Sequence, residues 1–129
     1  MNKILLLLTG GAIGTIARYG LSGLTHRCFK GTYPLGTLVV NLFGSLVIGL
    51  LWGIWENGYI HTNLRTFIFI GLLGGFTTFS TYMLESLNLF RDGETKMALI
   101  NIFAHNILGL SFVFIGFIMA KELLNFIRS

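Results

Sequence analysis

The segment Gly71-Leu-Leu-Gly74-Gly75-Phe-Thr-Thr-Phe-Ser-Thr-Tyr82 lies inside an uncharged run that extends from residue 66 to residue 84. An apolar run of about 20 residues is long enough to cross the hydrocarbon layer as a helix. The segment, however, places two glycines before two β-branched threonines, and both residue types are poor helix formers. Backbone at membrane depth leaves the helix only where it is buried in protein or lines a cavity. We therefore predict a membrane-spanning helix with a break in its middle.

Four hydroxyl side chains in this segment indicate that it contacts polar partners within the membrane. Hydroxyls at Thr77, Thr78, Ser80 and Thr81 are costly in lipid unless they face protein, water or an ion. Carbonyls at the ends of half-helices can hold a cation. The alternative is a kinked but continuous helix whose hydroxyls bond back to their own turns.

Phe79 and Tyr82 are three residues apart and share one helix face. Aromatic rings carry a positive edge, which can hold an anion. Packing is the commoner explanation for such a pair, and the residues alone favour it.

Outward from this segment, the chain contains three further apolar stretches with few charges. Of its 129 residues, 53% are hydrophobic and only 11% are charged, whereas a soluble domain carries about 25% charged residues. The start of the chain resembles a secretory signal without a convincing cleavage site, so we expect an uncleaved first span. We predict an all-α membrane protein with a single domain over residues 1–129. Its four spans are expected at residues 4–25, 35–55, 66–89 and 96–121.

The composition argues against several classes of function. The net charge is +4, but the basic residues lie at the ends of apolar runs, where they are typical of membrane-interface anchors rather than of nucleic-acid contacts. The single cysteine, Cys28, excludes an intramolecular disulfide. Motifs for hydrolysis, phosphate binding or structural metal are absent from the sequence, so we expect a protein that is not an enzyme. Glu85, near the edge of the third span, is interpreted as a cap at the membrane interface.

The basic residues are divided equally between the two sides of the membrane. One side is expected to hold Lys3, Arg65, Lys121 and Arg128, and the other Arg27, Lys30, Arg91 and Lys96. Because an excess of Lys and Arg sets orientation, a balanced chain has no preferred one. We infer dual topology with antiparallel pairing of two copies; the alternative is that a partner or an insertion factor sets one orientation.

Polar residues inside the other spans are candidate functional groups. Arg18 interrupts the first span, where an arginine is costly and usually functional unless it snorkels to the interface. In the second span, Thr37, Asn41, Ser45, Gly49 and Gly53 recur every four residues and share one face. That face is compatible with helix packing and with a pathway lined by Asn41. In the fourth span, Asn101, His105 and Gly109 form a stripe, and a neutral histidine between helices is favoured.

Taken together, these motifs resemble those of the small bacterial fluoride channels of the Fluc (CrcB) family over nearly the whole chain. The resemblance is carried by three groups of residues, one in each of the first three spans. These are Gly11, Gly14 and Arg18; Gly36–Asn41 with Gly44; and Gly74–Thr81.

The resemblance implies a fluoride-selective channel that exports fluoride passively across the cytoplasmic (inner) membrane and protects the cell from its toxicity. It implies an antiparallel, dual-topology dimer with two pores and a structural sodium ion (Na⁺) at its centre. The sodium would be held by the main-chain carbonyls of Gly74 and Thr77. The implied pore residues are Asn41, Phe79, Tyr82, Ser80, Thr81, Arg18 and Thr37.

The chain departs from the family pattern at Tyr82, where the family has a second pore phenylalanine. This leaves open whether both pores conduct equally, and whether the partner is a second copy or a paralogous subunit of a heterodimer. A small dual-topology multidrug exporter is a rival class, but it needs a carboxylate in an early span. The chain has no Asp or Glu before Glu56, which argues against that class. A non-transporting assembly subunit is a further rival.

Overall fold

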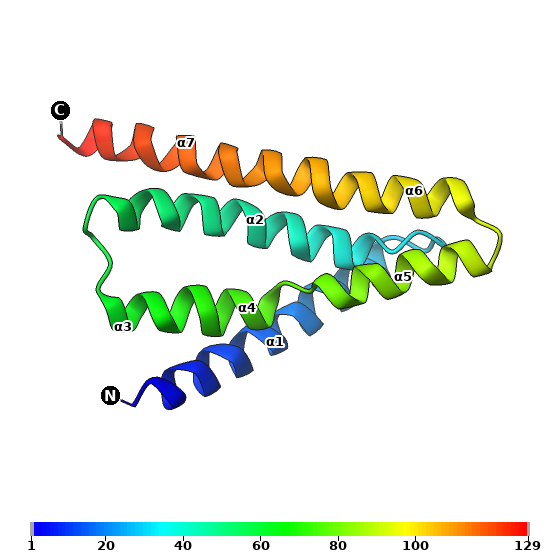
Figure 1. The fold of residues 1–129 in the computed structure, drawn as a ribbon, viewed down its shortest axis with the longest axis horizontal. Coiled ribbons are helices and arrows are strands. Elements are labelled where there is room, and N and C mark those ends of the chain that lie inside the picture. The colour runs from blue at the N-terminus through cyan, green and yellow to red at the C-terminus, as the bar shows by residue number, and fades with distance from the viewer. Residues whose placement is uncertain (1, 129) are drawn as a thin grey trace.

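The computed structural model describes residues 2–128, and every regular element among them is helical (Figure 1). Four helical stretches are long and apolar enough to cross a membrane, as predicted. The first and second spans are single helices, α1 (Lys3–Cys28) and α2 (Leu35–Glu56). The third span, Thr62–Arg91, consists of α3 (Thr62–Arg65), the π-helical turn η1 (Thr66–Leu72), α4 (Leu73–Phe76) and α5 (Phe79–Arg91). The fourth span, Thr95–Arg128, consists of α6 (Thr95–Phe103), the π-helical turn η2 (Ala104–Leu108) and α7 (Gly109–Arg128).

Local chemistry explains where several helices begin and end. The Asn2 side chain accepts a hydrogen bond of 3.1 Å from the amide of Ile4 and so caps α1. Pro34 immediately precedes α2 and lacks an N–H that would otherwise need a partner. Gly58 and Gly93 have φ of 82° and 81°, a region that glycine enters without steric cost, and they lie in the two tight connections.

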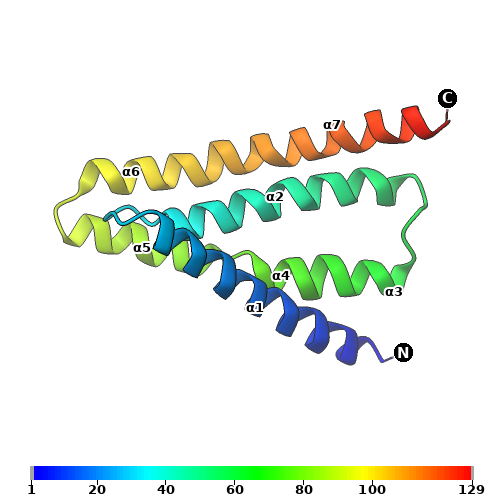
Figure 2. The ribbon, with the colours of Figure 1, turned by 180° about the vertical axis from the view of Figure 1, so that it is seen from behind.

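The four spans lie side by side and alternate in direction (Figures 1 and 2). The most extensive packing is between α2 and α7, while α1 lies across η1 and α4. The N-terminus, α3 and the C-terminus are at one end of the molecule, and the 29–34 and 92–94 connections are at the other. The two sets of four basic residues that were predicted to lie on opposite sides of the membrane therefore lie at opposite ends of the molecule. A dimer and a dual topology remain predictions.

Glycines let these spans approach closely. A Cβ added to Gly10 would lie 2.6 Å from the Phe67 carbonyl oxygen, and one on Gly14 would collide with the backbone of Leu72. Gly49 of α2 likewise meets the backbone of Val113 in α7. Small residues at such contacts are the usual solution in membranes, where helix association depends on close packing rather than on the hydrophobic effect.

The outer surface is largely apolar. Ile16 is 70% exposed and Phe126 80% exposed in the single chain, and many other large apolar side chains point outward. Few apolar side chains are fully buried, which is the reverse of a water-soluble domain. Lipid, or a second protein chain, is the environment that suits such a surface.

The close contact at Gly14 can be tested by adding one methyl group. We expect Gly14→Ala to lower the free energy of unfolding by ~1–3 kcal/mol, because overpacking forces backbone to move. Gly23→Ala is the matched control: it lies on the same helix, and nothing lies within 4 Å of its added Cβ. Thermal unfolding of both variants in detergent measures the difference. Equal midpoints would show that α1 does not pack as described.

Candidate functional site

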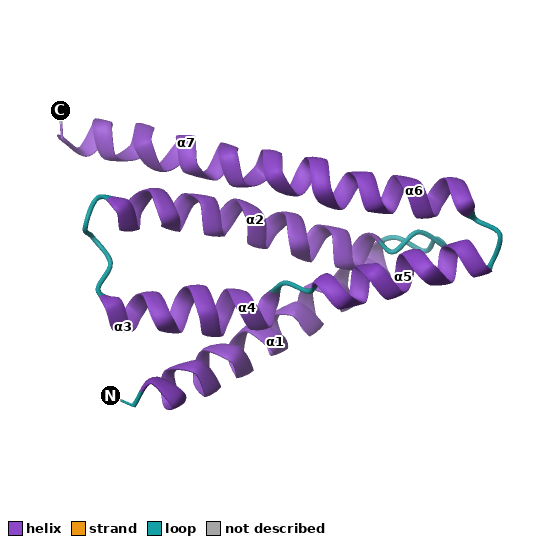
Figure 3. Ribbon diagram, in the orientation of Figure 1, coloured by secondary structure: helices purple, strands orange, loops and turns teal. Residues whose placement is uncertain are grey.

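The third span contains two consecutive residues that are not helical. Helix α4 ends at Phe76 and α5 begins at Phe79. Between them Thr77 (φ −80°, ψ 158°) and Thr78 (φ −148°, ψ 115°) have extended conformations. Figure 3 shows this link as a short loop between α4 and α5. Extended backbone within a span leaves amide and carbonyl groups that the helix no longer pairs.

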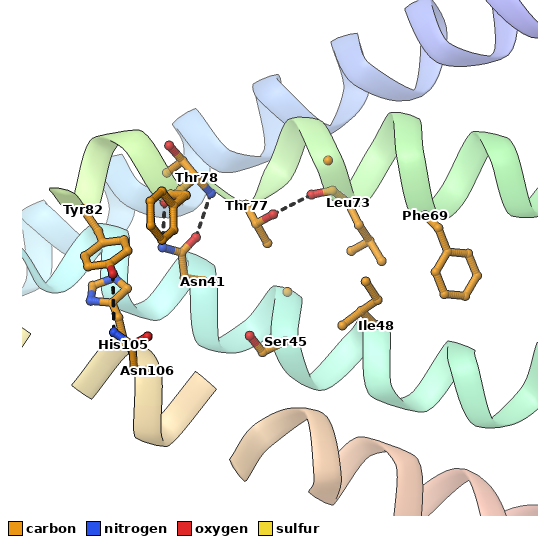
Figure 4. Close-up of a pocket in the computed structure, with 13 residues that line it drawn as sticks. Asn41, Ser45, Ile48, Phe69, Leu73, Thr77, Thr78, Tyr82, His105 and Asn106 are labelled. Carbon is orange, nitrogen blue, oxygen red and sulfur yellow. Dashed lines mark hydrogen bonds between the residues drawn. The ribbon is translucent and has the colours of Figure 1, made fainter. Parts of the chain in front are cut away.

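Asn41 of α2 pairs with the backbone of this link. Its Oδ1 accepts from the amide of Thr78 at 2.8 Å, and its Nδ2 donates to the Thr78 carbonyl at 2.9 Å (Figure 4). The side-chain amide of Asn41 thus supplies partners for both the N–H and the carbonyl of Thr78, which would otherwise be unpaired in an apolar environment. Asn41 was predicted to line an anion path. It does line a cavity, but one N–H and the oxygen of its amide are already used.

The non-helical link leaves carbonyl groups at the end of α4 and in the link without their helical donors, and those of Gly74 and Thr77 are two of them. In a continuous helix the amide of Thr78 would bond to the Gly74 carbonyl, and that of Thr81 to the Thr77 carbonyl. Here the Thr78 amide donates to Asn41, and the Thr81 amide donates to the Thr78 hydroxyl at 3.3 Å. The oxygens of Gly74 and Thr77 are therefore available to other partners.

A groove of about 440 Å³ runs along this link, between α2, α4, α5 and η2 (Figure 4). It brings together five of the nine residues that the family resemblance implies for the pore and the sodium ion. Those five are Asn41, Gly74, Thr77, Phe79 and Tyr82. His105 and Asn106 of η2 complete one wall.

The two aromatic residues at the groove contact each other. The ring centroids of Phe79 and Tyr82 are 5.1 Å apart, and the ring planes are at 89°. Phe79 is 69% exposed in the single chain, whereas Tyr82 is only 4% exposed. Within one chain the rings therefore do not flank a gap; Phe79 faces outward, and Tyr82 lies behind it.

A second cavity, of about 290 Å³, lies between α1, α2 and α5. It contains the other polar residues of interest, Arg18, Thr37 and Thr81, and shares Thr78 with the groove. Ser80 is exposed and lines neither cavity. The candidate residues thus fall into two groups on either side of the link.

Glu85, which was interpreted as an interfacial cap, has a hydrogen-bond partner in α2. It lies within α5 and accepts a hydrogen bond of 2.6 Å from the hydroxyl of Thr37. In the nearby 29–34 connection, burial raises the pKa of the Tyr33 phenol, and the negative charge of Glu85 adds to that rise. Glu85 is therefore a partly buried carboxylate that is bonded to Thr37, a residue that lines the second cavity.

Sequence reasoning did not assign Glu85, Asn106 or the Thr78 backbone to the site. Glu85 is three residues after Tyr82 and therefore shares its helix face, a signal that could have placed it. Asn106 follows His105 directly, and adjacent residues on an α-helix point in different directions. The π-helical turn η2 widens the helix there.

Comparison with known proteins gives a consistent result. The family model described as CrcB-like protein, Camphor Resistance (CrcB), matches residues 5–117. A protein of Parabacteroides distasonis is 47% identical over 128 residues, which cover 99% of this chain and 100% of that protein. A protein of Nitratidesulfovibrio vulgaris is 43% identical, over 90% and 94% of the two chains. One of Salinibacter ruber is 46% identical, over 90% and 87%. All three relatives are named fluoride-specific ion channel FluC.

The pairing of Asn41 with Thr78 predicts a large effect on stability. We expect Asn41→Leu to destabilise the protein by roughly 1–3 kcal/mol for each group left unpaired, because both the amide and the carbonyl of Thr78 lose their partner. Ser45→Ala, one turn further along α2, is the control. Thermal unfolding in detergent compares the two variants. A wild-type midpoint for Asn41→Leu would contradict the assignment.

Proposed function

The chain belongs to the CrcB-like protein family, and we propose that it is a fluoride-selective ion channel through which fluoride leaves the cell passively. Relatives named fluoride-specific ion channel FluC match nearly the whole chain. The four helices that are long and apolar enough to cross a membrane make this a multi-pass membrane protein. The structural observation that best supports the proposal is the extended Thr77–Thr78 link. Non-helical backbone within a span is tolerated only where it is buried in protein or lines a cavity, and this link lines the groove.

Fluoride must exchange its hydrating water molecules for hydrogen-bond donors of the protein, because the free-energy cost of placing a bare anion in hydrocarbon is prohibitive. The hydroxyls of Ser80 and Thr81 and the ring of Phe79 are exposed at the start of α5 and would supply such contacts. Arg18, in the second cavity, would raise the local positive potential. The remaining N–H of Asn41 would complete a series of weak sites, which permits both entry and exit. The hydroxyl proton of Thr37 is already donated to Glu85, so Thr37 would line the path without donating to fluoride.

We propose that the active form is an antiparallel, dual-topology homodimer in the cytoplasmic membrane. The outward Phe79 ring and the groove beside it form only part of an enclosed path in one chain, so a second copy would have to complete it. Equal numbers of basic residues at the two ends of the molecule agree with insertion in both orientations.

The residues at the link fit the sodium ion that the family resemblance implies. Unwound carbonyls are the ligands that hold sodium at broken membrane helices. The oxygens of Gly74 and Thr77 have lost their helical donors, and two copies would supply four such oxygens. The bound ion would add positive charge near the anion path.

A heterodimer with a paralogous subunit is the alternative, and Tyr82 is the reason to consider it. In this structure Asn106 donates to the Tyr82 hydroxyl at 3.4 Å, so the extra oxygen has a partner in its own chain. A second copy can therefore pair with the first without leaving that hydroxyl unsatisfied. This observation favours the homodimer.

Fluoride efflux from liposomes containing the purified protein tests the function. We expect the wild type to release fluoride but not chloride, and Phe79→Ile to block release, because the isoleucine side chain has no positive ring edge. Asn41→Asp should also abolish flux by placing an anion at the path. Ser111→Ala, whose hydroxyl bonds only within the fourth span, should conduct as the wild type does. Size-exclusion chromatography must show that Phe79→Ile remains a dimer. Normal fluoride flux in that variant would reject the ring-edge contact.

Cys28 is the only cysteine and is exposed at one end of the molecule, so it can report topology. Dual topology predicts that an impermeant thiol reagent labels about half of Cys28 in intact cells. A double variant, Cys28→Ser with His61→Cys, moves the thiol to the opposite end of the molecule. About half of its molecules should also be labelled. Complete labelling of one position and none of the other would show a single orientation.

A further inference from the structure

The π-helical turn η2 places two adjacent polar residues against Tyr82. The imidazole of His105 stacks on the Tyr82 ring, with centroids 4.3 Å apart and planes at 12°. The amide of Asn106 donates to the Tyr82 hydroxyl at 3.4 Å and to the carbonyl of Ile102 at 2.7 Å. One residue therefore contacts the face of the ring and the next contacts its polar tip (Figure 4).

His105 is itself held in place by a buried polar network. Its Nδ1 is 2.9 Å from the Asn101 carbonyl, and since a carbonyl only accepts, Nδ1 carries the proton. Asn101 is completely buried, and its Nδ2 donates to the Ser86 hydroxyl at 3.0 Å. Ser86 in turn donates to the Tyr82 carbonyl at 2.8 Å. The network connects η2 to the backbone of the same tyrosine that His105 stacks on.

The orientation of Tyr82 also affects Phe79. The two rings meet edge to face, and Phe79 is otherwise mostly exposed at the start of α5. The edge of an aromatic ring is positive and its face is negative. A rotation of Phe79 would therefore replace an attractive surface for an anion by a repulsive one.

We propose that His105 and Asn106 are positioning residues for conduction: they hold the Tyr82 ring, and through it they orient the Phe79 ring toward the anion. The proposal rests on the proposed channel function. Neither residue needs to touch fluoride.

A double-mutant cycle on fluoride efflux from liposomes tests the role of Asn106. We expect Asn106→Leu to lower the flux of the wild type about fivefold, a loss comparable to that of one hydrogen bond. In a Tyr82→Phe background the same change should have no further effect, because the hydroxyl that Asn106 contacts is gone. An equal loss in both backgrounds would overturn the proposal. If leucine at position 106 prevents dimer formation, Asn106→Ala gives the same comparison.

Two substitutions of His105 test the stacking contact. His105→Phe keeps a flat ring against Tyr82, whereas His105→Leu has similar bulk but cannot stack. We expect His105→Phe to conduct about tenfold faster than His105→Leu, while both have similar unfolding midpoints, since the effect acts on ring orientation rather than on folding. Equal fluxes for the two variants would overturn the proposal.

The wild type and Ser111→Ala, measured in the same liposomes, separate this proposal from the proposed function. If the wild type releases no fluoride, the channel function itself fails. If the wild type and Ser111→Ala conduct but Asn106→Leu and His105→Leu behave like them, only the positioning role fails.

Discussion

The two hydrogen bonds between Asn41 and the backbone of Thr78 are the interaction on which the site depends. They satisfy an amide and a carbonyl that an extended residue within a span would otherwise leave unpaired. They also remove the donor from the Gly74 carbonyl. Without this contact the amide and the carbonyl of Thr78 would each lose a partner, at a cost of about 1–3 kcal/mol per group.

Close helix packing makes this contact possible. A carboxamide side chain is short, so α2 must lie near the third span for Asn41 to reach Thr78. Gly44, one turn from Asn41, meets the side chain of Thr77, and a Cβ at that position would occupy the same space. The glycines of α2 therefore serve both packing and site geometry. Gly49 and Gly53 face α7, and Gly44 faces the Thr77–Thr78 link.

A series of contacts connects the buried residue Asn101 to the exposed ring of Phe79. Asn101 holds His105, His105 stacks on Tyr82, and Tyr82 meets the outward Phe79 edge to face. A tyrosine in place of a phenylalanine brings a hydroxyl that must be satisfied, and Asn106 satisfies it. The Tyr82 hydroxyl thus has a hydrogen-bond partner in η2 of its own chain.

The four spans, and the end of the molecule at which each basic residue lies, could be predicted from the sequence, because span length and hydropathy are local properties of the chain. The sequence also directed attention to the Gly74–Thr81 run, since poor helix formers and hydroxyls are visible residue by residue. Which polar groups pair with each other could be learned only from the packing of the helices. Asn41 and Thr78 are 37 residues apart, and Thr37 and Glu85 are 48 apart. Such partners depend on how the helices pack and on the widened turn at η2, and no periodicity within a single span encodes either.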